Sequence, residues 1–180
     1  MKYDIEKIKE IVRLTPDIQF VYFWKPVQNA SLMTEACLSQ WHDCCFEVDG
    51  LRYHTAEQFM MAGKARLFGD QEVLDQIMAA DNPHDVKKLG RLIRGFQQER
   101  WDEAKSAIVV EGNKAKFSQN PALREFLLST GDAVLAEASP YDRIWGIGLD
   151  REAAMSVGVE GWKGENLLGC ALMEVRDWLR

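Results

Sequence analysis

A carboxylate and an amine stand two helical turns apart in residues 55–64. Glu57 and Lys64, with flexible methionines between them, are spaced so that they share one stripe of a helix. Thr55 is the expected N-cap and Gln58 holds the capping-box position. Glu57 then falls in the first turn, where the helix dipole favours negative charge. Such a pair can hold one polar ligand, although the same pattern also fits surface charges that flank a core stripe.

A second polar segment spans residues 137–148 and carries a different mixture of side chains. It contains two carboxylates, Glu137 and Asp142, together with an arginine, Trp145 and Gly146. Loops bear binding and catalytic residues more often than packed elements do, and glycine allows the backbone to approach a ligand closely. The segment is therefore a candidate binding loop. An ordinary glycine-rich turn in which the indole fills a gap is the competing interpretation.

A third segment, residues 161–166, leads directly into the last helical pattern of the chain. Trp162 and two glycines precede Asn166, the expected cap of that helix. The N–H groups at a helix start suit a phosphate or sugar hydroxyls, so an anion site is predicted here. Trp162 is open to the same two interpretations as Trp145, stacking on a ligand or filling a gap.

Composition limits the classes of protein to consider. The chain has 180 residues, 47% of them hydrophobic, and a formal net charge of −6. Its length favours a single domain with a full core. The acidic charge argues against a broad face that binds a nucleic-acid backbone, but leaves room for a small phosphate pocket. No apolar run reaches the length of a membrane span, and a cytoplasmic protein that does not contact a membrane is expected.

Three of the four cysteines, Cys37, Cys44 and Cys45, lie close to His42 in the sequence, and Cys170 stands apart. Their spacing matches neither C-x2-C nor H-x3-H, the patterns typical of zinc sites. Reduced structural thiols are therefore expected, with no metal and no cofactor.

Periodicity predicts a mainly α protein with a small antiparallel β element, an α+β fold. Apolar spacing, caps and turn residues predict helices over 4–14, 55–67, 70–80, 83–88, 98–117, 121–128 and 166–180. Strands are expected over 20–24 and 133–136, and a hairpin with an Asp-Gly turn over 44–53. Residues 28–43 are expected to be irregular, and residues 137–166 show only weak periodicity.

A succession of short blocks extends along most of the chain. In order they are Phe23-Trp24, Leu38-Ser39, Asp49-Gly50, Tyr53, Thr55-Ala56-Glu57-Gln58, Gly63-Lys64-Ala65, Leu89-Gly90-Arg91, Trp101, Lys116-Phe117, Thr130-Gly131-Asp132, Glu137-Ala138-Ser139, Asp142, Trp145-Gly146-Ile147-Gly148, Trp162, Asn166-Leu167-Leu168-Gly169 and Leu172-Met173-Glu174-Val175-Arg176. This order closely resembles the YbiA-like or NADAR family. The resemblance covers roughly residues 20–179, far more specifically than any single block. One domain over 1–180 is expected, with residues 1–19 as an N-terminal helical extension and 20–180 as the family-like core.

Two positions depart from the family pattern. Ser39-Gln40 stands where the family usually has Ser-Asn, and Glu57-Gln58 where it usually has Glu-His. Gln40 keeps an amide that donates and accepts hydrogen bonds. Gln58 cannot titrate, which puts any proton-relay role of that position in doubt.

The resemblance implies cleavage of an N-glycosidic bond. The expected activity is hydrolysis of the C1–N bond of phosphorylated ribosylaminopyrimidine intermediates of riboflavin biosynthesis. The alternatives are an ADP-ribosyl hydrolase that removes ADP-ribose from a nucleobase, and a non-catalytic module that binds ADP-ribose or NAD. A helical interaction protein with structural tryptophans is a further alternative. The implied partner is a small phosphorylated riboside or an ADP-ribose conjugate, with ADP-ribosylated nucleic acid as an additional class. The oligomeric state stays open.

Roles follow for the candidate residues. Glu57 or Asp142 is expected to stabilise an oxocarbenium-like centre and to activate water. Lys64 is either a counter-charge or a nucleophile that forms a Schiff base, which requires a neutral amine. Arg91 is expected to bind phosphate, unless it forms a structural ion pair. The carboxylates, the amine and the 142–146 turn are expected to meet around one cavity. The predicted substrate-binding residues are Phe23, Ser39, Arg91, Glu137, Trp145, Gly146, Trp162 and Asn166.

Overall fold

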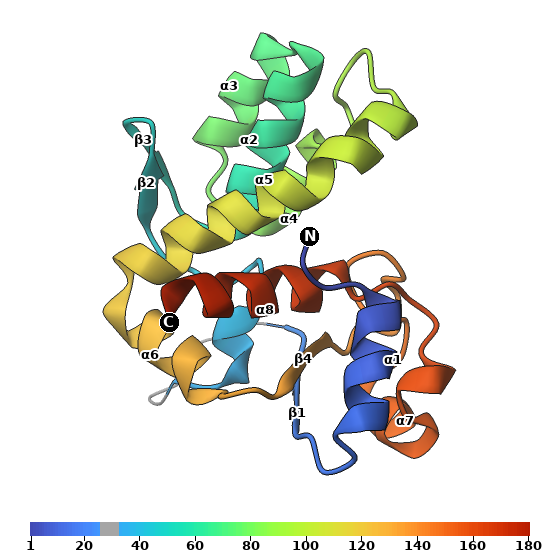
Figure 1. Ribbon diagram of the computed structural model, residues 1–180. Helices are drawn as coiled ribbons and strands as arrows, with labels where there is room; N and C mark the ends of the chain where they lie inside the picture. Colours follow the sequence, from blue (N-terminus) through green and yellow to red (C-terminus); the bar gives the residue numbers. More distant parts are fainter. Residues whose placement is uncertain (26–32) are drawn as a thin grey trace. The chain divides into compact units, whose positions relative to one another are not determined.

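The computed structural model describes residues 1–25 and 33–180 and divides into two compact units (Figure 1). The first unit combines residues 1–39 with 122–180, and the second comprises residues 40–121. Most of the described chain is helical, which confirms the predicted α+β class. Within the described residues, no helix has the length and apolar character needed to cross a membrane. The assignment of the whole chain to one domain stays a prediction.

The first unit is built around a pair of parallel strands and a buried helix. Strand β1 (Phe20–Phe23) pairs with β4 (Val134–Glu137) in parallel, from Phe20 opposite Val134 to Phe23 opposite Glu137. Helix α8 (Leu167–Leu179) packs against β4, as Figure 1 shows in red beside orange. The other elements are α1 (Ile5–Leu14), the 3-10 helices η1 (Glu35–Leu38) and η2 (Val159–Gly161), α6 (Pro121–Ser129) and α7 (Arg151–Val157). Both strands were predicted, but their parallel pairing was not.

Four helices and a hairpin form the second unit. Strands β2 (Phe46–Val48) and β3 (Leu51–Tyr53) are antiparallel, and Asp49 and Gly50 at their turn both have positive φ. These angles suit the Asp-Gly turn predicted for this hairpin. The helices are α2 (Ala56–Phe68), α3 (Gln71–Ala79), α4 (Pro83–Leu89) and α5 (Gln98–Gln119). Helix α2 packs against the other three, so it is the centre of this unit.

Glycines allow α2 to approach its neighbours closely. A Cβ atom added at Gly112 of α5 would lie 2.5 Å from Cδ1 of Phe59, and one added at Gly63 would lie 2.7 Å from Cγ2 of Ile108. These distances leave no room for a side chain at either glycine. Because α2 is covered on several sides, even its polar N-terminal residues are buried, Glu57 among them.

Two expectations for irregular segments need correction. Residues 137–166 contain α7 and η2, and Asp150 caps α7 by accepting a hydrogen bond from the Ala153 N–H at 2.9 Å. Both helices are too short to produce a clear apolar period. Within 28–43, η1 forms behind the N-cap Thr34, and residues 28–32 lie outside the described part of the chain.

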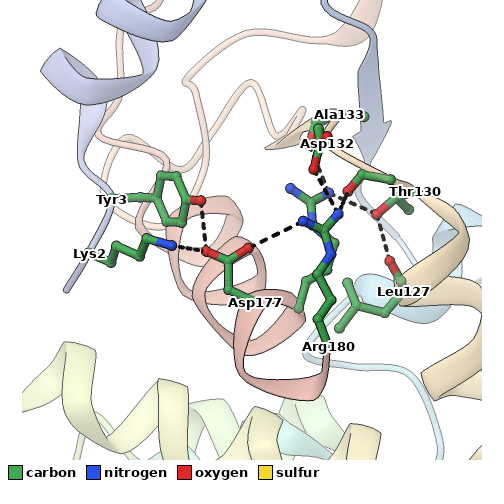
Figure 2. Close-up of polar contacts among 10 residues, drawn as sticks. Lys2, Tyr3, Leu127, Thr130, Asp132, Ala133, Asp177 and Arg180 are labelled. Carbon is green, nitrogen blue, oxygen red and sulfur yellow. Dashed lines mark hydrogen bonds and ion pairs between the residues drawn. The ribbon is translucent and has the colours of Figure 1, made fainter.

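The N-terminal extension is part of the first unit. Asp4 caps α1, and Ile8 on this helix is fully buried. The Tyr3 hydroxyl donates to Asp177 at 2.9 Å, and the Lys2 side chain also binds Asp177 (Figure 2). Lys2 and Tyr3 are therefore held against α8 by specific polar contacts.

Candidate active site

Glu57 lies buried at the start of α2, with 4% of its surface exposed. Thr55 is the N-cap, as predicted, and its hydroxyl accepts from the Gln58 N–H at 3.1 Å. The Glu57 N–H donates to the Gln40 carbonyl at 3.0 Å, which ties this first turn to the preceding segment. A buried carboxylate is costly unless its surroundings stabilise it. The interpretation of Glu57 as a surface charge is therefore wrong.

The Gln58 side chain forms hydrogen bonds with the backbone around the start of the same helix. Its Oε1 atom accepts from the His54 N–H at 2.8 Å, and its Nε2 atom donates to the Ile77 carbonyl at 3.0 Å. The predicted capping box is thus altered, because the side chain receives the N–H of His54 and not that of the cap residue. The amide uses both of its ends within the protein, which explains why glutamine is accommodated here.

A pair of buried amides lies beside Glu57. Asn113 of α5 donates from Nδ2 to Oε1 of Gln40 and to the Val109 carbonyl, both at 2.9 Å. Gln40 is 7% exposed and Asn113 is fully buried. Within the described residues, Nε2 of Gln40 and Oδ1 of Asn113 have no hydrogen-bond partner. Sequence reasoning missed Asn113, whose one signal was an amide in the interior of a long helix.

Lys64 lies in an aromatic environment. Its amine donates to the Gly90 carbonyl at 2.9 Å and lies 4.4 Å from the Phe96 ring centroid and 5.5 Å from that of Trp101. Within the described residues the amine forms no ion pair with a carboxylate. Burial lowers the pKa of Lys64 below its ordinary value. The site thus favours the neutral amine more than water does.

Arg91 lies next to the carbonyl that Lys64 binds, so the structure brings these two predicted residues together. The Arg91 side chain is exposed. The ion pairs formed among the described residues do not include Arg91, so the predicted structural ion pair is not observed. Helix α4 contacts α2 here through Gly90, where an added Cβ would lie 2.1 Å from the Met61 sulfur. Arg91 thus follows the end of α4 with an exposed side chain.

Asp142 shapes the loop that contains it. Its Oδ1 atom accepts from the N–H groups of Ile144 at 2.9 Å and Trp145 at 2.8 Å. Gly146 is buried, and a Cβ there would lie 2.8 Å from the Glu137 carbonyl oxygen. Trp145 and Glu137 are both partly buried. The contacts explain why this loop needs an aspartate and a glycine at these positions.

Asn166 connects the last helix to strand β4. It is the N-cap residue of α8, as predicted, and is fully buried with φ of 55°, but its side chain makes no capping hydrogen bond. Its Nδ2 atom donates to the Leu135 carbonyl at 2.9 Å and its Oδ1 atom accepts from the Glu137 N–H at 3.0 Å. The N–H groups of Leu167 and Leu168 bind loop carbonyls at 3.1 Å. This helix start thus holds the preceding loop instead of presenting those donors to an anion.

The remaining predicted residues of the first unit are largely packed. The Trp162 ring is 6.2 Å from Phe20, edge to face, and packs against a buried cluster that includes Ile147. Ser39 is 5% exposed. Phe23, 2% exposed, lines a cavity of about 710 Å³ at the end of β1. Among the predicted substrate-binding residues, Phe23 thus lines a cavity.

The catalytic candidates are distributed over both units. Glu57, Lys64 and Arg91 belong to the second unit, and Asp142, Trp145 and the other candidates belong to the first. Each set is described within its own unit, and the expectation that they share one cavity stays a prediction. In the described residues, no group of three His, Cys, Asp or Glu side chains is arranged to hold a metal ion.

Comparison with known proteins gives consistent matches over most of the chain. Residues 22–180 match the family model described as NADAR domain. N-glycosidase R617 of Acanthamoeba polyphaga mimivirus is 49% identical over 125 residues, 69% of this chain and 74% of that protein. Riboflavin biosynthesis protein VVA0006 of Vibrio vulnificus is 28% identical over 90% of this chain, which spans 39% of that protein. The NMR structure of the E. coli protein YbiA aligns with a TM-score of 0.70 and 26% identity, over 89% of this chain and 84% of that one.

Proposed function

Because the chain belongs to the NADAR family and is a hydrolase acting on N-glycosyl bonds, we propose that its substrate is a 5′-phosphorylated ribosylaminopyrimidine of riboflavin biosynthesis. Two relatives support this proposal: the viral protein named as an N-glycosidase, and the Vibrio vulnificus protein named for riboflavin biosynthesis. The reaction adds water across the C1–N bond, so that ribose 5-phosphate and the free aminopyrimidine are released.

The observation that carries the proposal is the buried carboxylate of Glu57. A carboxylate held at a helix start and shielded from water can stabilise positive charge that develops at C1. In the proposed step, Glu57 takes a proton from water as the water oxygen attacks C1. The electron pair of the C1–N bond leaves with the nitrogen, which gains a proton. Gln40 and Asn113 hold the segment that precedes α2 and so position this carboxylate.

Lys64 supports two forms of this chemistry. As a cation it would balance the charge of the substrate phosphate, together with Arg91. As a neutral amine it would attack C1 of the ring-opened ribosylamine, where C1 is bonded to the pyrimidine nitrogen as an imine. The free aminopyrimidine leaves as the Lys64 Schiff base forms, and water then hydrolyses this Schiff base to release ribose 5-phosphate and the lysine amine. The lowered pKa of the amine supports the second form, whereas its cation–π contacts with Phe96 and Trp101 support the first.

Asp142 is the second candidate for the acidic role. Its Oδ1 atom already accepts two backbone hydrogen bonds within its loop. We therefore assign the principal role to Glu57 and a loop-positioning role to Asp142.

The test replaces Glu57 with Gln and measures release of ribose 5-phosphate by mass spectrometry. We expect the rate to fall by about 10²–10⁴-fold, the usual range for a general acid–base group. The matched control is Glu103→Gln, at an exposed position of α5, which should keep full activity. Melting curves of both variants check the fold. Full activity in Glu57→Gln would remove this residue from the mechanism.

Borohydride reduction separates the two forms for Lys64. A substrate-dependent mass adduct that maps to Lys64, and is absent from Lys64→Arg, identifies the Schiff base. No adduct in the wild-type protein assigns the counter-charge role. Adding an ADP-ribosylated nucleobase to the substrate panel tests the alternative hydrolase activity, and saturable binding of ADP-ribose without any product would indicate a binding module.

A further inference from the structure

The hairpin of the second unit, β2–β3 in Figure 1, carries an exposed thiol with two basic side chains beside it. Cys45 directly precedes β2, and its side chain is exposed. Its Sγ atom lies 3.7 Å from Nδ1 of His54 and accepts a hydrogen bond from Nη2 of Arg52 at 3.1 Å. A nucleophile, a base and a cation are thus in mutual contact, and none of them is among the residues assigned to hydrolysis.

The register of the hairpin brings these three side chains together. Phe46 is paired with Tyr53, so Cys45 lies opposite His54, one position further along the two strands. Successive side chains of a strand point to opposite faces. Phe46 and Tyr53 are buried, whereas Cys45, Arg52 and His54 are exposed. The cluster therefore occupies the solvent face of the hairpin.

Contacts with the end of α5 fix the backbone that carries the thiol. The Cys45 carbonyl accepts from Nδ2 of Asn120 at 3.1 Å. Gln119 donates to the Glu47 carbonyl at 2.7 Å and accepts from the Glu47 N–H at 2.8 Å. Glu47 is the cross-strand partner of Arg52, but among the described residues Arg52 forms no ion pair with a carboxylate. The guanidinium is thus directed to the sulfur.

The two basic side chains suit the nucleophilic form of cysteine, which is the thiolate. Nδ1 of His54 can accept the thiol proton, and the Arg52 guanidinium can stabilise the negative charge left on the sulfur. The hydrogen bond to Cys45 also raises the pKa of Arg52, so this side chain stays a cation. A nucleophile within reach of a base and next to a cation is the arrangement of an activated thiol.

The other three cysteines of the chain, Cys37, Cys44 and Cys170, are buried. Burial raises the pKa of Cys44, and it raises the pKa of Cys170 to about 12. Structural thiols of this kind are inert. Cys44 adjoins Cys45 in the sequence, but its buried side chain is not placed to displace a group from the exposed sulfur. A mixed disulfide formed at Cys45 should therefore persist until an external thiol attacks it.

We propose that Cys45 is a site of reversible S-thiolation by a low-molecular-weight disulfide of the glutathione disulfide type. His54 takes the proton of the Cys45 thiol, and the thiolate attacks one sulfur of the disulfide. The S–S bond of the reagent breaks as the new S–S bond forms, and the departing thiolate takes up the proton from His54. Attack by a free thiol on the mixed disulfide restores Cys45. The proposal goes beyond the N-glycosidase function and does not depend on it.

The test exposes the full chain to excess glutathione disulfide at pH 7 and follows the intact mass with time. We expect one glutathionyl group, mapped to Cys45 by peptide analysis and removed by dithiothreitol. Cys45→Ser should acquire none. A larger thiolate fraction is partly offset by lower intrinsic nucleophilicity, so the expected gain in rate over N-acetylcysteine is modest, about threefold or more.

Two variants test the roles of the neighbouring side chains. Arg52→Gln and His54→Gln should each slow thiolation by about threefold, because each removes a group that favours the thiolate. Arg100→Gln and His84→Gln are the matched controls, at exposed positions of the same unit, and should react at the wild-type rate. Melting curves check that all four variants are folded.

Three results would overturn the proposal. They are modification of a buried cysteine in preference to Cys45, a rate no higher than that of N-acetylcysteine, and a wild-type rate in either Arg52→Gln or His54→Gln. Glu57→Gln should lose hydrolysis but be thiolated at the wild-type rate. Failure of the thiolation site and failure of the proposed catalysis are therefore distinguishable.

Discussion

Gln58 shows how a single side chain can replace the residue that its family usually carries. Its amide accepts from one backbone group and donates to another across 19 residues of sequence. An imidazole has one acceptor and one donor nitrogen in its neutral form, fixed on a rigid ring. The two partners of Gln58 are placed for a longer and more flexible amide.

We therefore expect Gln58→His to lose stability and to gain no activity. Leaving one of the two buried backbone groups without a partner should lower the free energy of unfolding by about 1–3 kcal/mol. Urea titration measures the change, with Gln71→His at the exposed start of α3 as the control. A stable variant with faster hydrolysis would instead show that the histidine serves catalysis.

Asp70 leads to a second prediction, which concerns how the stability of the protein changes at acidic pH. Its carboxylate accepts from the Arg94 N–H at 2.8 Å, from Nε at 3.0 Å and from Nη2 at 2.6 Å, and it also caps α3. The hydrogen bonds from Arg94 hold the pKa of Asp70 well below its ordinary value. The folded protein then binds this proton more weakly than the unfolded chain does. The resulting stability is present above the unfolded pKa of about 3.9 and is lost as the pH falls below it.

Asp70→Asn should accordingly reduce the melting temperature at pH 7 and flatten its decline between pH 5 and pH 2. Thermal melts across this range measure both effects. Asp75→Asn on the same helix, where Asp75 is exposed, is the matched control. An unchanged acid profile in Asp70→Asn would show that other carboxylates govern acid unfolding.

At the scale of secondary-structure elements, a glycine of the family-like sequence blocks allows a helix to pack closely on a strand. Gly169 lies in the first turn of α8, where an added Cβ would be 2.1 Å from the Leu135 carbonyl oxygen. The helix can therefore lie directly on β4, and Asn166 binds the same strand. The block Asn166-Leu167-Leu168-Gly169 is thus explained by the packing of α8 on β4.

Gly169→Ala should be strongly destabilising, because the new methyl group meets backbone that cannot move aside. We expect a loss of about 3 kcal/mol, at the upper end for overpacking. Gly50→Ala is the contrasting control, since no atom lies within 4 Å of a Cβ added at Gly50. The alanine there is destabilising only because the backbone has a positive φ. Its expected cost is about 1 kcal/mol. Equal losses in both variants, measured by chemical unfolding, would contradict the steric explanation.

The elements also show what sequence reasoning can reach. Helices α1 and α5 were predicted from apolar spacing and α2 from its N-cap, which are local signals, and the Asp-Gly hairpin was predicted for the same reason. Helix α7 was missed because seven residues carry too little period. The pairing of β1 with β4 was not predicted, because no local pattern specifies a partner so distant in the chain.

For the candidate site, spacing correctly placed Glu57 and Lys64 on α2. The partners that complete their surroundings come from elsewhere in the chain: Gln40 and Asn113 for Glu57, and Gly90 and Phe96 for Lys64. Such contacts depend on tertiary packing, so sequence periodicity cannot supply them. The roles of Asp142 and Asn166 within their loop were missed for the same reason.

At the scale of the whole molecule, the first unit is completed by both ends of the chain. Arg176 of α8 is 2% exposed and donates to the Thr130 hydroxyl and the Ala133 carbonyl, each at 2.8 Å. Burial lowers the pKa of this guanidinium, yet its hydrogen bonds hold α8 to the turn before β4. Figure 2 shows how Asp177 on the same helix binds Lys2 and Tyr3.

Arg176→Met should release this turn and lower the free energy of unfolding by about 3 kcal/mol, because two buried backbone and hydroxyl acceptors lose their donor. Arg180→Met removes a partly exposed arginine that contacts Asp132 and should cost about 1 kcal/mol or less. Guanidinium unfolding curves of the two variants give the comparison. A smaller loss for Arg176→Met than for Arg180→Met would refute the assigned role of the buried guanidinium.

The order of the units along the chain has a consequence for biosynthesis. Strand β1 leaves the ribosome more than a hundred residues before β4, the partner that completes its hydrogen bonds. The hairpin and helices α2 to α5 lie in one continuous stretch of sequence between the two strands. They can therefore fold before β4 is available to pair with β1. Nascent chains arrested when residue 121 has emerged from the ribosome and β4 has not should therefore already protect the middle stretch from protease, while the first 39 residues stay open to cleavage until translation is nearly finished.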